Sequence, residues 1–454
     1  MRILLIQPHS SPSTIGADEL YMHEPLALEY IAAGVIAEHD VKILDMRLER
    51  DLKGVFDGFR PDVVGITAYT VNVNIVKGLF REIKRWNPEV FTVVGGHHAT
   101  VSPEDFLSPD IDIVVMGEGV FVFRELIRRI EKKEGFEGIK GIICKRDGSI
   151  IKTPPEPVAD LDAFPFPERR LTERYRREYF TEWMKPLASV RTSKGCPFRC
   201  SFCALWKLAG GRYLRRRPEM IIKELAEIEE EFVFFADDES LIDARRMRTL
   251  AELIKEAGIK KKYFLYGRSD TIARHPELLE LWKDIGLERV FVGLEFFRDD
   301  DLKYIKKGST IRQNEEAVKI LQALDIEIYA SFIVRPEFHR SDFRQFRQYC
   351  RRMGLNFATF SVLTPLPGTD FYEEVKDRLI THNYDYFDFI HTLLPTSLPL
   401  KEFYKEMYYL YKKAIPVSKS ISVLKRFPLR DIPMIIRRSN KILRQIRDAY
   451  KDYE

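Results

Sequence analysis

Residues 188–203 read Ala-Ser-Val-Arg-Thr-Ser-Lys-Gly-Cys-Pro-Phe-Arg-Cys-Ser-Phe-Cys, a short apolar run that leads into a loop with three cysteines. Cys196, Cys200 and Cys203 have C-x3-C-x2-C spacing, and no fourth cysteine or histidine lies close by in the sequence. A closed structural zinc site needs four ligands. Three thiolates on one tight loop suit a 4Fe–4S cluster with one iron open to a small molecule. We interpret the loop as such a cluster site; zinc or three incidental thiols are the weaker alternatives.

Strands and helices alternate from this loop towards the C-terminus. The candidate strands are Ser189–Thr192, Phe232–Ala236, Tyr263–Tyr266, Arg289–Leu294, Ile328–Val334 and Phe357–Leu363, separated by amphipathic helices such as Pro218–Glu231 and Ala244–Ala257. Six such units predict a partial (β/α)6 barrel of the TIM type, with its active site at the carboxyl ends of the strands. Polar residues follow three of these strands: Asp237 and Asp238, then Arg268, then Glu295.

The first ~150 residues show the same alternation. Candidate strands are Ile3–Ile6, Val41–Leu44, Val63–Thr67, Thr92–Val94 and Ile113–Met116, with helical patterns around Pro25–Glu38, Asn72–Trp86 and Val120–Lys133. This order predicts a doubly wound, Rossmann-like parallel sheet, whose ligands bind beyond the carboxyl ends of the strands. A hairpin over Ile142–Ile151, with Asp147-Gly148 at its turn, is expected to close the region.

We place four segments along the chain. Residues 1–151 form the first domain, 152–187 a proline-rich linker, 188–370 the barrel, and 371–454 a C-terminal helical region. The last helix has apolar residues on one face between Ile432 and Ile446 and basic residues on the others. Such a helix lies on anionic lipid or docks on its own protein, and docking is the commoner case.

Composition narrows the class of protein. The chain has 454 residues, 45% of them hydrophobic, and a net charge of +4, which does not call for nucleic acid. Cys144 and Cys350 lie far apart, in strand and helix contexts, so the five cysteines are not a disulfide framework and suit a reducing cytosol. We see neither a signal peptide nor an apolar run long enough to span a bilayer, and we expect a cytoplasmic enzyme.

Several motifs together resemble those of a known family. The run Lys194–Cys203, Phe-Ala-Asp-Asp-Glu ending at Glu239, Val-Gly-Leu-Glu ending at Glu295 and Thr-Pro-Leu-Pro-Gly-Thr ending at Thr369 are similar to motifs of radical S-adenosylmethionine (SAM) enzymes. Val-Val-Gly-Gly-His-His-Ala-Thr ending at Thr100 and Met-Gly-Glu-Gly ending at Gly119 resemble turns of a cobalamin-binding domain. Residues 1–400 thus resemble the cobalamin-dependent radical SAM enzymes.

The resemblance implies three cofactors: a 4Fe–4S cluster, SAM and cobalamin. It places the backbone of Phe202 near the adenine, Asp237 and Asp238 at the SAM amino group, Arg268 at the SAM carboxylate and Glu295 at the ribose. The expected cobalamin contacts are Pro8, His9, Thr67, Tyr69, Thr70, Gly95, Gly96, His97, Gly117, Glu118 and Gly119. The pattern Asp-x-His-x-x-Gly is absent, so no histidine ligand below cobalt is expected.

A further expectation concerns the charge around the cluster loop. Lys194 and Arg199 flank the first two cysteines. Cations beside a thiol favour its thiolate form. We therefore expect these two residues to help the cysteines bind iron.

The implied reaction is methylation of an unactivated carbon through a 5′-deoxyadenosyl radical and methylcobalamin. Residues 391–411 are similar to the C-terminal region of hopanoid C-3 methylases, which favours a lipid or other apolar small molecule as substrate. We also expect a reducing donor of the flavodoxin or ferredoxin type, and a peripheral contact of the tail with the inner membrane surface. Two other functions stay open: a cyclase or rearrangement enzyme of the anaerobic porphyrin-cyclase type, and a cobalamin sensor or carrier with a structural cluster.

Overall fold

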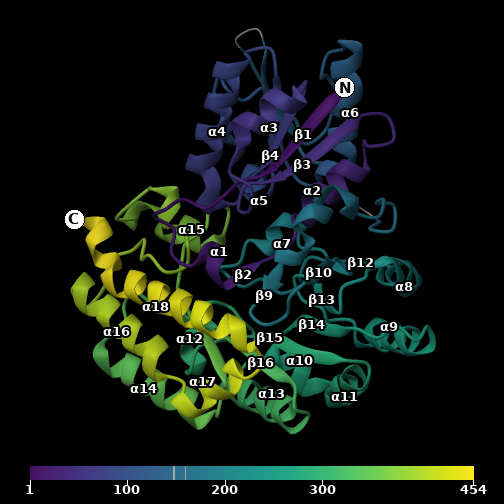
Figure 1. Cartoon of the computed structure of the whole chain (residues 1–454). Helices are drawn as coiled ribbons and strands as arrows, with labels where there is room; N and C mark the ends of the chain where they lie inside the picture. Colours follow the sequence, from purple (N-terminus) through teal and green to yellow (C-terminus); the bar gives the residue numbers. More distant parts are fainter. Residues whose placement is uncertain (147–148, 159) are drawn as a thin grey trace.

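The computed structural model describes residues 1–146, 149–158 and 160–454. Its N-terminal part is a seven-stranded sheet in the order β3-β1-β4-β5-β6-β7-β8 (Figure 1). The strands are β1 Arg2–Gln7, β3 Asp40–Asp45, β4 Val63–Thr67, β5 Phe91–Gly95, β6 Ile113–Val115, β7 Ile142–Arg146 and β8 Ser149–Lys152. The first five in this order are parallel, and β7 and β8 are antiparallel to their neighbours.

This sheet is buried on both faces. Leu4 and Ile6 of β1 belong to one apolar cluster, whereas Ile3 and Leu5 belong to another, because alternate side chains of a strand point to opposite faces. The covering helices are α2 Leu26–Ala33, α3 Leu52–Phe59, α4 Val73–Trp86 and α6 Gly119–Lys132. The winding direction reverses between β1 and β4, which puts a ligand crevice at the carboxyl ends of these strands.

The predicted doubly wound, Rossmann-like sheet with five parallel strands is confirmed. Helix α3 is missing from the predicted elements because its sequence, Leu-Lys-Gly-Val-Phe-Asp-Gly-Phe, carries two glycines and buries only Leu52 and Phe56. The hairpin of β7 and β8 is present; its predicted turn, Asp147-Gly148, lies outside the described residues.

The second part is a partial barrel of six parallel strands in sequential order. These are β10 Leu187–Val190, β13 Phe232–Phe235, β14 Lys262–Gly267, β15 Leu287–Glu295, β16 Glu327–Val334 and β17 Phe357–Val362. The helices around it include α8 Pro218–Glu227, α9 Ala244–Glu256, α10 Ser269–Arg274, α11 Pro276–Asp284, α12 Asp299–Tyr304, α13 Ile311–Ala323 and α14 Arg340–Arg352. The predicted (β/α)6 barrel is confirmed.

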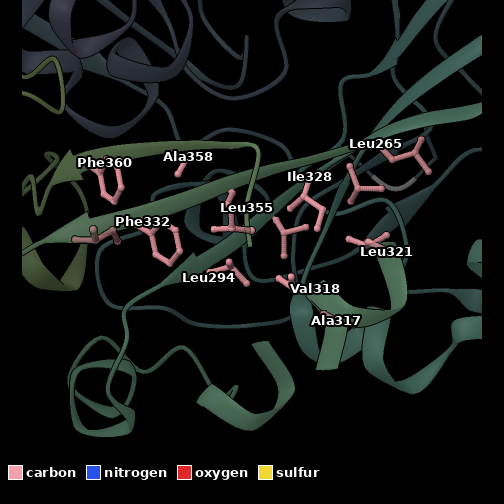
Figure 2. Packing of buried hydrophobic residues seen from close by; sticks show 14 of the residues in the cluster. Leu265, Leu294, Ala317, Val318, Leu321, Ile328, Phe332, Leu355, Ala358 and Phe360 are labelled. Carbon is pink, nitrogen blue, oxygen red and sulfur yellow. The ribbon is translucent and has the colours of Figure 1, made fainter. Parts of the chain in front are cut away.

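Side chains on the barrel strands face two different environments. Ile328 and Phe332 of β16 point outward: Figure 2 shows Ile328 beside Val318 and Leu321 of α13, and Phe332 beside Phe360 of β17. Tyr329, between them in sequence, belongs instead to an aromatic cluster in the barrel interior. The interior is therefore lined by rings, and the layer between strands and helices is mostly aliphatic.

The C-terminal region is helical, with α15 Asp370–Val375, α16 Leu400–Lys413, α17 Val417–Leu424 and α18 Ile432–Asp448. Helix α18 packs along α16 and crosses the body of the molecule (Figure 1). Ile442 and Ile446 are buried in the barrel's main core. Much of the apolar face of this helix thus docks on its own protein. In the described part of the chain, no helix is long and apolar enough to cross a membrane.

Ion pairs fasten the connector before the barrel to both halves. Arg169, in a 3₁₀ segment over Arg169–Glu178, pairs with Glu24 at 2.7 Å and with Glu224 of α8 at 2.6 Å. The short strand β9 (Phe180–Thr181) pairs with β2 (Tyr21–Met22) of the first domain. These contacts fix how the sheet sits on the barrel.

Candidate active site

The cysteine loop begins at the end of β10 and is held by two aspartates that follow β13. Asp237 accepts hydrogen bonds from the backbone N–H groups of Thr192 and Ser193 at 2.7 and 2.8 Å. Asp238 accepts one from the backbone N–H of Gly195 at 2.6 Å. Because Asp237 captures the amides of residues 192 and 193, β10 ends at Val190, two residues before the predicted end.

Gly195 makes the turn into Cys196 with φ +86°. A Cβ at this position would overlap the carbonyl of Arg212 and lie 2.6 Å from the Cβ of Ala209. Only glycine combines a positive φ with so close a backbone approach. The tight loop therefore depends on this residue.

Arg268, after β14, places a cation beside the cysteine loop. Its Nη1 lies 3.9 Å from the Sγ of Cys200, and its guanidinium stacks on Phe198 at 3.5 Å from the ring centroid. Arg268 also donates to Asp270 at 2.9 Å and to the carbonyl of Lys307 at 2.6 Å. These contacts tie Arg268 to the cysteine loop.

The expectation that Lys194 and Arg199 assist the thiols is wrong in this geometry. Lys194 is paired with Glu118, and Arg199 lies over the ring of Trp206. Burial raises the pKa of Cys196 to about 11 and that of Cys203 to about 12. The thiolates must thus be stabilised by the iron they bind, with Arg268 as the neighbouring positive charge.

The donor set fits a cluster. Three thiols stand on one loop, Cys200 is buried, and the other two are half-buried. In the described residues, no three His, Cys, Asp or Glu side chains converge on a single metal ion. The fit therefore rests on the three sulfur donors, their shielding from solvent and the adjacent guanidinium.

Glu295 ends β15 in a left-handed conformation, with φ +60°, after a break in the strand register at Gly293. Its Oε1 accepts a hydrogen bond from the Nζ of Lys307 at 2.6 Å, and both side chains are buried. Burial opposes the charge on Lys307, but Glu295 and Cys200 together raise its pKa. The predicted ribose contact is therefore one half of a buried ion pair near the cluster loop.

Glu239 adds a third carboxyl behind the cysteine loop. Its Oε1 accepts from the backbone N–H of Arg268 at 3.1 Å, and its buried Oε2 has no hydrogen-bond partner in the part of the chain that the structure describes. Burial raises the pKa of Glu239 to about 7. This carboxyl has an unsatisfied acceptor that a bound amino or hydroxyl group would satisfy.

Three tyrosines gather where the sheet meets the barrel. Tyr21 and Tyr69 each expose 48% of their surface, and the pKa of Tyr21 is raised by burial and then by the neighbouring Tyr69. Burial, together with Tyr21, Tyr69 and Asp238, raises the pKa of Tyr266 of the barrel, so its hydroxyl lies near theirs. We call the solvent-accessible space beside these three side chains the chamber.

Two predicted cobalamin contacts face this chamber. Tyr69 and His97 pack edge to face with ring centroids 4.8 Å apart. Burial and the charge of Lys194 lower the pKa of His97 to about 4, so its imidazole is neutral at pH 7. The two predicted contacts thus lie side by side at the junction of the sheet and the barrel.

Three of the predicted cobalamin glycines are required for packing within the protein. A Cβ on Gly96 would lie 2.8 Å from Ala68 and Thr67, and one on Gly119 would lie 2.8 Å from Ile31. A Cβ on Gly117 would approach Pro155 at 3.0 Å. These glycines thus allow close packing of the loops, whereas Gly95 makes only ordinary contacts.

The remaining predicted residues are spread around the two halves. Thr70 is tied to buried His98 at 3.1 Å. Pro8 is buried, and His9 lines a hollow of about 430 Å³ with Met46 and Asn74. Phe202 packs against the main core beside the cysteine loop.

The two predicted cofactor loops touch each other. Glu118, after β6, is ion-paired with Lys194 of the cysteine loop and lies 3.6 Å from Arg191. Its side chain is largely buried. The structure therefore couples the cobalamin turn directly to the segment that carries the cluster.

A row of aromatic rings leads from the chamber into the barrel. Tyr21 neighbours His23, and His23 lies 4.6 Å from Phe234. The row continues through Tyr266 and Phe291, whose centroids are 4.7 Å apart, to Tyr329. Such a lining suits an apolar ligand.

Sequence reasoning missed Tyr21, His23 and Lys307. Tyr21 and His23 precede α2 in a stretch with no recognisable motif, and only the pairing of β2 with β9 brings them to the barrel. Lys307 stands twelve residues after its partner Glu295. The sequence carries no spacing signal for either contact.

Comparison with known proteins matches two parts of the chain to two families. Residues 12–127 match the family described as B12 binding domain, and residues 190–350 match the Radical SAM superfamily. The chain is similar to hopanoid C-3 methylase of Methylococcus capsulatus, with 34% identity over 414 residues, covering 88% of this chain and 79% of the relative.

Two further relatives align over most of the chain. An uncharacterized methyltransferase of Pyrococcus horikoshii is 31% identical over 422 residues, covering 89% of each chain. The anaerobic magnesium-protoporphyrin IX monomethyl ester cyclase of Rubrivivax gelatinosus is 27% identical over 408 residues, covering 86% of this chain and 73% of the relative.

Solved structures share the fold. OxsB, a cobalamin-dependent SAM radical enzyme, superposes with a TM-score of 0.73 at 16% identity, covering all of this chain and 71% of its own. The methyltransferase TsrM of Kitasatospora setae gives 0.65 at 21% identity, covering 83% of this chain and 76% of its own.

A doubly wound sheet over a six-stranded barrel, with three thiols at their junction, defines a radical SAM enzyme with a cobalamin domain. The methylase of Methylococcus capsulatus and the methyltransferase of Pyrococcus horikoshii, each above 30% identity, are named as methylating enzymes. The chain belongs to the cobalamin-dependent radical SAM methyltransferases. Its cofactors are a 4Fe–4S cluster, SAM and cobalamin.

Proposed function

We propose that the enzyme methylates an unactivated carbon of an apolar, lipid-like substrate bound in the aromatic interior of the barrel. The row of rings from Tyr21 to Tyr329 carries the proposal. It connects the chamber beside the cobalamin turns with the barrel, so one ligand can approach both cofactors. The similarity to hopanoid C-3 methylase supports the same substrate class.

The bound groups supply a substrate radical from the cluster and SAM, and a methyl group from the cobalamin side. We propose that the chain's own residues position these bound groups. Asp238 and the open Oε2 of Glu239 lie where the ammonium of SAM would pair with carboxylates. Glu295 is proposed for the ribose, with Lys307 holding its orientation. Neutral His97 and Tyr69 are proposed to face the corrin ring.

Exclusion of water is the other task of the protein. The tyrosine hydroxyls of the chamber have raised pKa values because burial disfavours their charged form. A reactive radical survives only where water and side reactions are kept out. The ion pair of Glu118 with Lys194 closes the junction beside the cysteine loop.

The test is anaerobic turnover of the reconstituted holoenzyme with methyl-deuterated SAM, a strong reductant and an extract of host lipids. We expect a lipid heavier by one trideuteromethyl group, together with S-adenosylhomocysteine and 5′-deoxyadenosine. Cys200→Ala, which removes one cluster ligand, should abolish both the deoxyadenosine and the labelled lipid.

Cyclisation is the second candidate, supported by the cyclase relative at 27% identity. It predicts deoxyadenosine without S-adenosylhomocysteine and no trideuteromethyl product. That outcome would replace the methylation proposal.

Two partners complete the proposal. We infer a flavodoxin- or ferredoxin-type electron donor, supported by exposed Arg199 on the cysteine loop, which an acidic protein can approach.

We also infer that the enzyme works beside a membrane, because an apolar substrate is supplied there. Much of the tail helix is excluded from this contact, since Ile442 and Ile446 are buried.

A further inference from the structure

The segment from α17 to the first turns of α18, residues 417–438, forms a surface hairpin, here called the C-terminal hairpin. Twelve large apolar side chains are exposed in the described chain, and five of them lie in this short segment. They are Val417, Ile421, Leu429, Met434 and Ile436; Leu429 exposes 85% and Val417 73% of its surface. Such a concentration of uncovered apolar side chains marks an interaction surface.

The same surface is cationic. Residues 417–438 contain six Lys and Arg residues against one Asp. Three of these cations have acidic partners: Arg426 pairs with Glu288 and Glu327, Arg430 with Asp431, and Arg438 with Glu19. The described structure shows no ion pair for Lys419, Lys425 or Arg437.

The inner face of the C-terminal hairpin is fully engaged. Val423 and Phe427 are buried among the rings of the barrel interior, with Ile432 and Ile435 packed beside them. Phe427 lies edge to face with Trp183 at 6.1 Å. The hairpin is thus part of the wall of the proposed substrate site, and its uncovered apolar side chains lie outside that packing.

We propose that the outer face of the C-terminal hairpin binds an anionic lipid bilayer. Apolar side chains that protrude among unpaired cations match an interface in which acyl chains lie beneath negative headgroups. A protein partner would have to neutralise these cations with its own acids, whereas a bilayer supplies both contacts at once. The binding itself is independent of catalysis; its purpose, delivery of an apolar substrate through the hairpin wall, rests on the proposed function.

The test is sedimentation of the full-length holoenzyme with phosphatidylcholine vesicles, with or without about one-third phosphatidylglycerol. Wild type should bind the anionic vesicles and be released by about 0.5 M salt. Replacing Lys419, Lys425 and Arg437 by Gln should weaken binding about a hundredfold, since each basic side chain near an anionic surface contributes about fivefold. Val417→Asp with Leu429→Asp should abolish it.

Ile380→Asp is the matched control, because Ile380 is exposed to 43% but lies outside the hairpin; it should bind like wild type. Equal binding by the Val417/Leu429 variant, or no binding by wild type, would overturn the proposal. A wild-type oligomer that the variant dissociates, with vesicle binding unchanged, would assign the surface to a second copy instead. All variants should cleave SAM normally; loss of methylated lipid with intact vesicle binding would count against the proposed function alone.

Discussion

At the scale of single residues, the cysteine loop depends on a glycine that the three-cysteine motif does not explain. Gly195 has φ +86° and no room for a Cβ, whereas Gly210, in the same region with φ +62°, has no atom within 4 Å of the place that a Cβ would occupy. The two positions share the backbone preference and differ in the space around them. Alanine substitutions at these two glycines therefore distinguish the free-energy cost of a positive φ from the free-energy cost of a steric clash.

Gly195→Ala should destabilise the fold by about 1–3 kcal/mol more than Gly210→Ala, because overpacking adds to the backbone strain. It should also reduce the iron bound per chain after reconstitution. Thermal unfolding and iron analysis of both variants provide the check. Equal losses in the two variants would show that the loop tolerates a side chain at position 195.

Arg268 is the charged residue expected to tune the cluster. Removing a positive charge 3.9 Å from the Sγ of Cys200 makes addition of an electron less favourable. Arg268→Gln should lower the reduction potential of the cluster, whereas Arg268→Lys should stay closer to wild type. The measurement is a redox titration followed by electron paramagnetic resonance.

The control is Arg274→Gln, at the end of helix α10, which Arg268 precedes; the Arg274 side chain is exposed to 61%. It should leave the potential at the wild-type value. An unchanged potential in Arg268→Gln with full iron content would remove this role from Arg268.

At the scale of elements, the connector contacts helix α2 through the carboxyl group of Glu29, which is buried with incomplete hydrogen bonding. Glu29 is fully buried and accepts a hydrogen bond from Thr172; within the described residues its Oε2 has no hydrogen-bond partner and only an ion-pair contact with Arg169 at 3.7 Å. Burial, reinforced by the charge of Glu24, raises the pKa of Glu29 from 4.5 to about 8. The folded chain therefore keeps a proton that the unfolded chain releases above about pH 4.5.

Unfolding thus releases a proton between these two pKa values, and stability falls as pH rises from about 4.5 to 8. The expected slope from this group is of the order of 1 kcal/mol per pH unit. Glu29→Gln should make the melting temperature nearly independent of pH over this window. Its stability advantage over wild type should be greatest above pH 8. Exposed Glu38→Gln should follow the wild-type profile; parallel profiles for all three proteins would contradict the role of Glu29.

At the scale of the whole molecule, the two cofactor halves are joined by the ion pair of Glu118 with Lys194. Glu118→Gln replaces a charged hydrogen bond by a neutral one and should cost about 1–2 kcal/mol of local stability. Amide exchange at residues 192–196 should speed up by about tenfold, because 1.4 kcal/mol corresponds to that factor. Hydrogen–deuterium exchange of the holoenzyme measures it.

Glu125→Gln is the matched control in α6, the helix that follows Glu118; its side chain is 38% exposed and pairs with Arg128 and Arg129 of that helix. It should leave residues 192–196 protected. Equal protection in Glu118→Gln would mean that the halves are held together by other contacts, such as those of Arg169.

The architecture followed from local pattern. Short apolar runs alternating with amphipathic stretches predicted both parallel sheets, since buried strands and one-faced helices leave that signature in any sequence. The cysteine spacing predicted the cluster loop for a similar reason, because its three ligands are close in sequence. Residues such as Asp237 and Glu295 were found because carboxyl ends of strands are a fixed place in the fold.

Only the tertiary structure decided what depends on distant partners. The pairing of Lys307 with Glu295, the placement of Arg268 on Cys200 and the use of Gly96 for loop packing have no signature in sequence spacing. The chamber lined by Tyr21, Tyr69 and Tyr266 draws on both halves of the chain. The sequence by itself determined the two folds and the cluster loop. The packing of the two halves determined which charged side chains pair, which residues line the chamber and which face of the tail helix is buried, because these features arise only where separate segments meet.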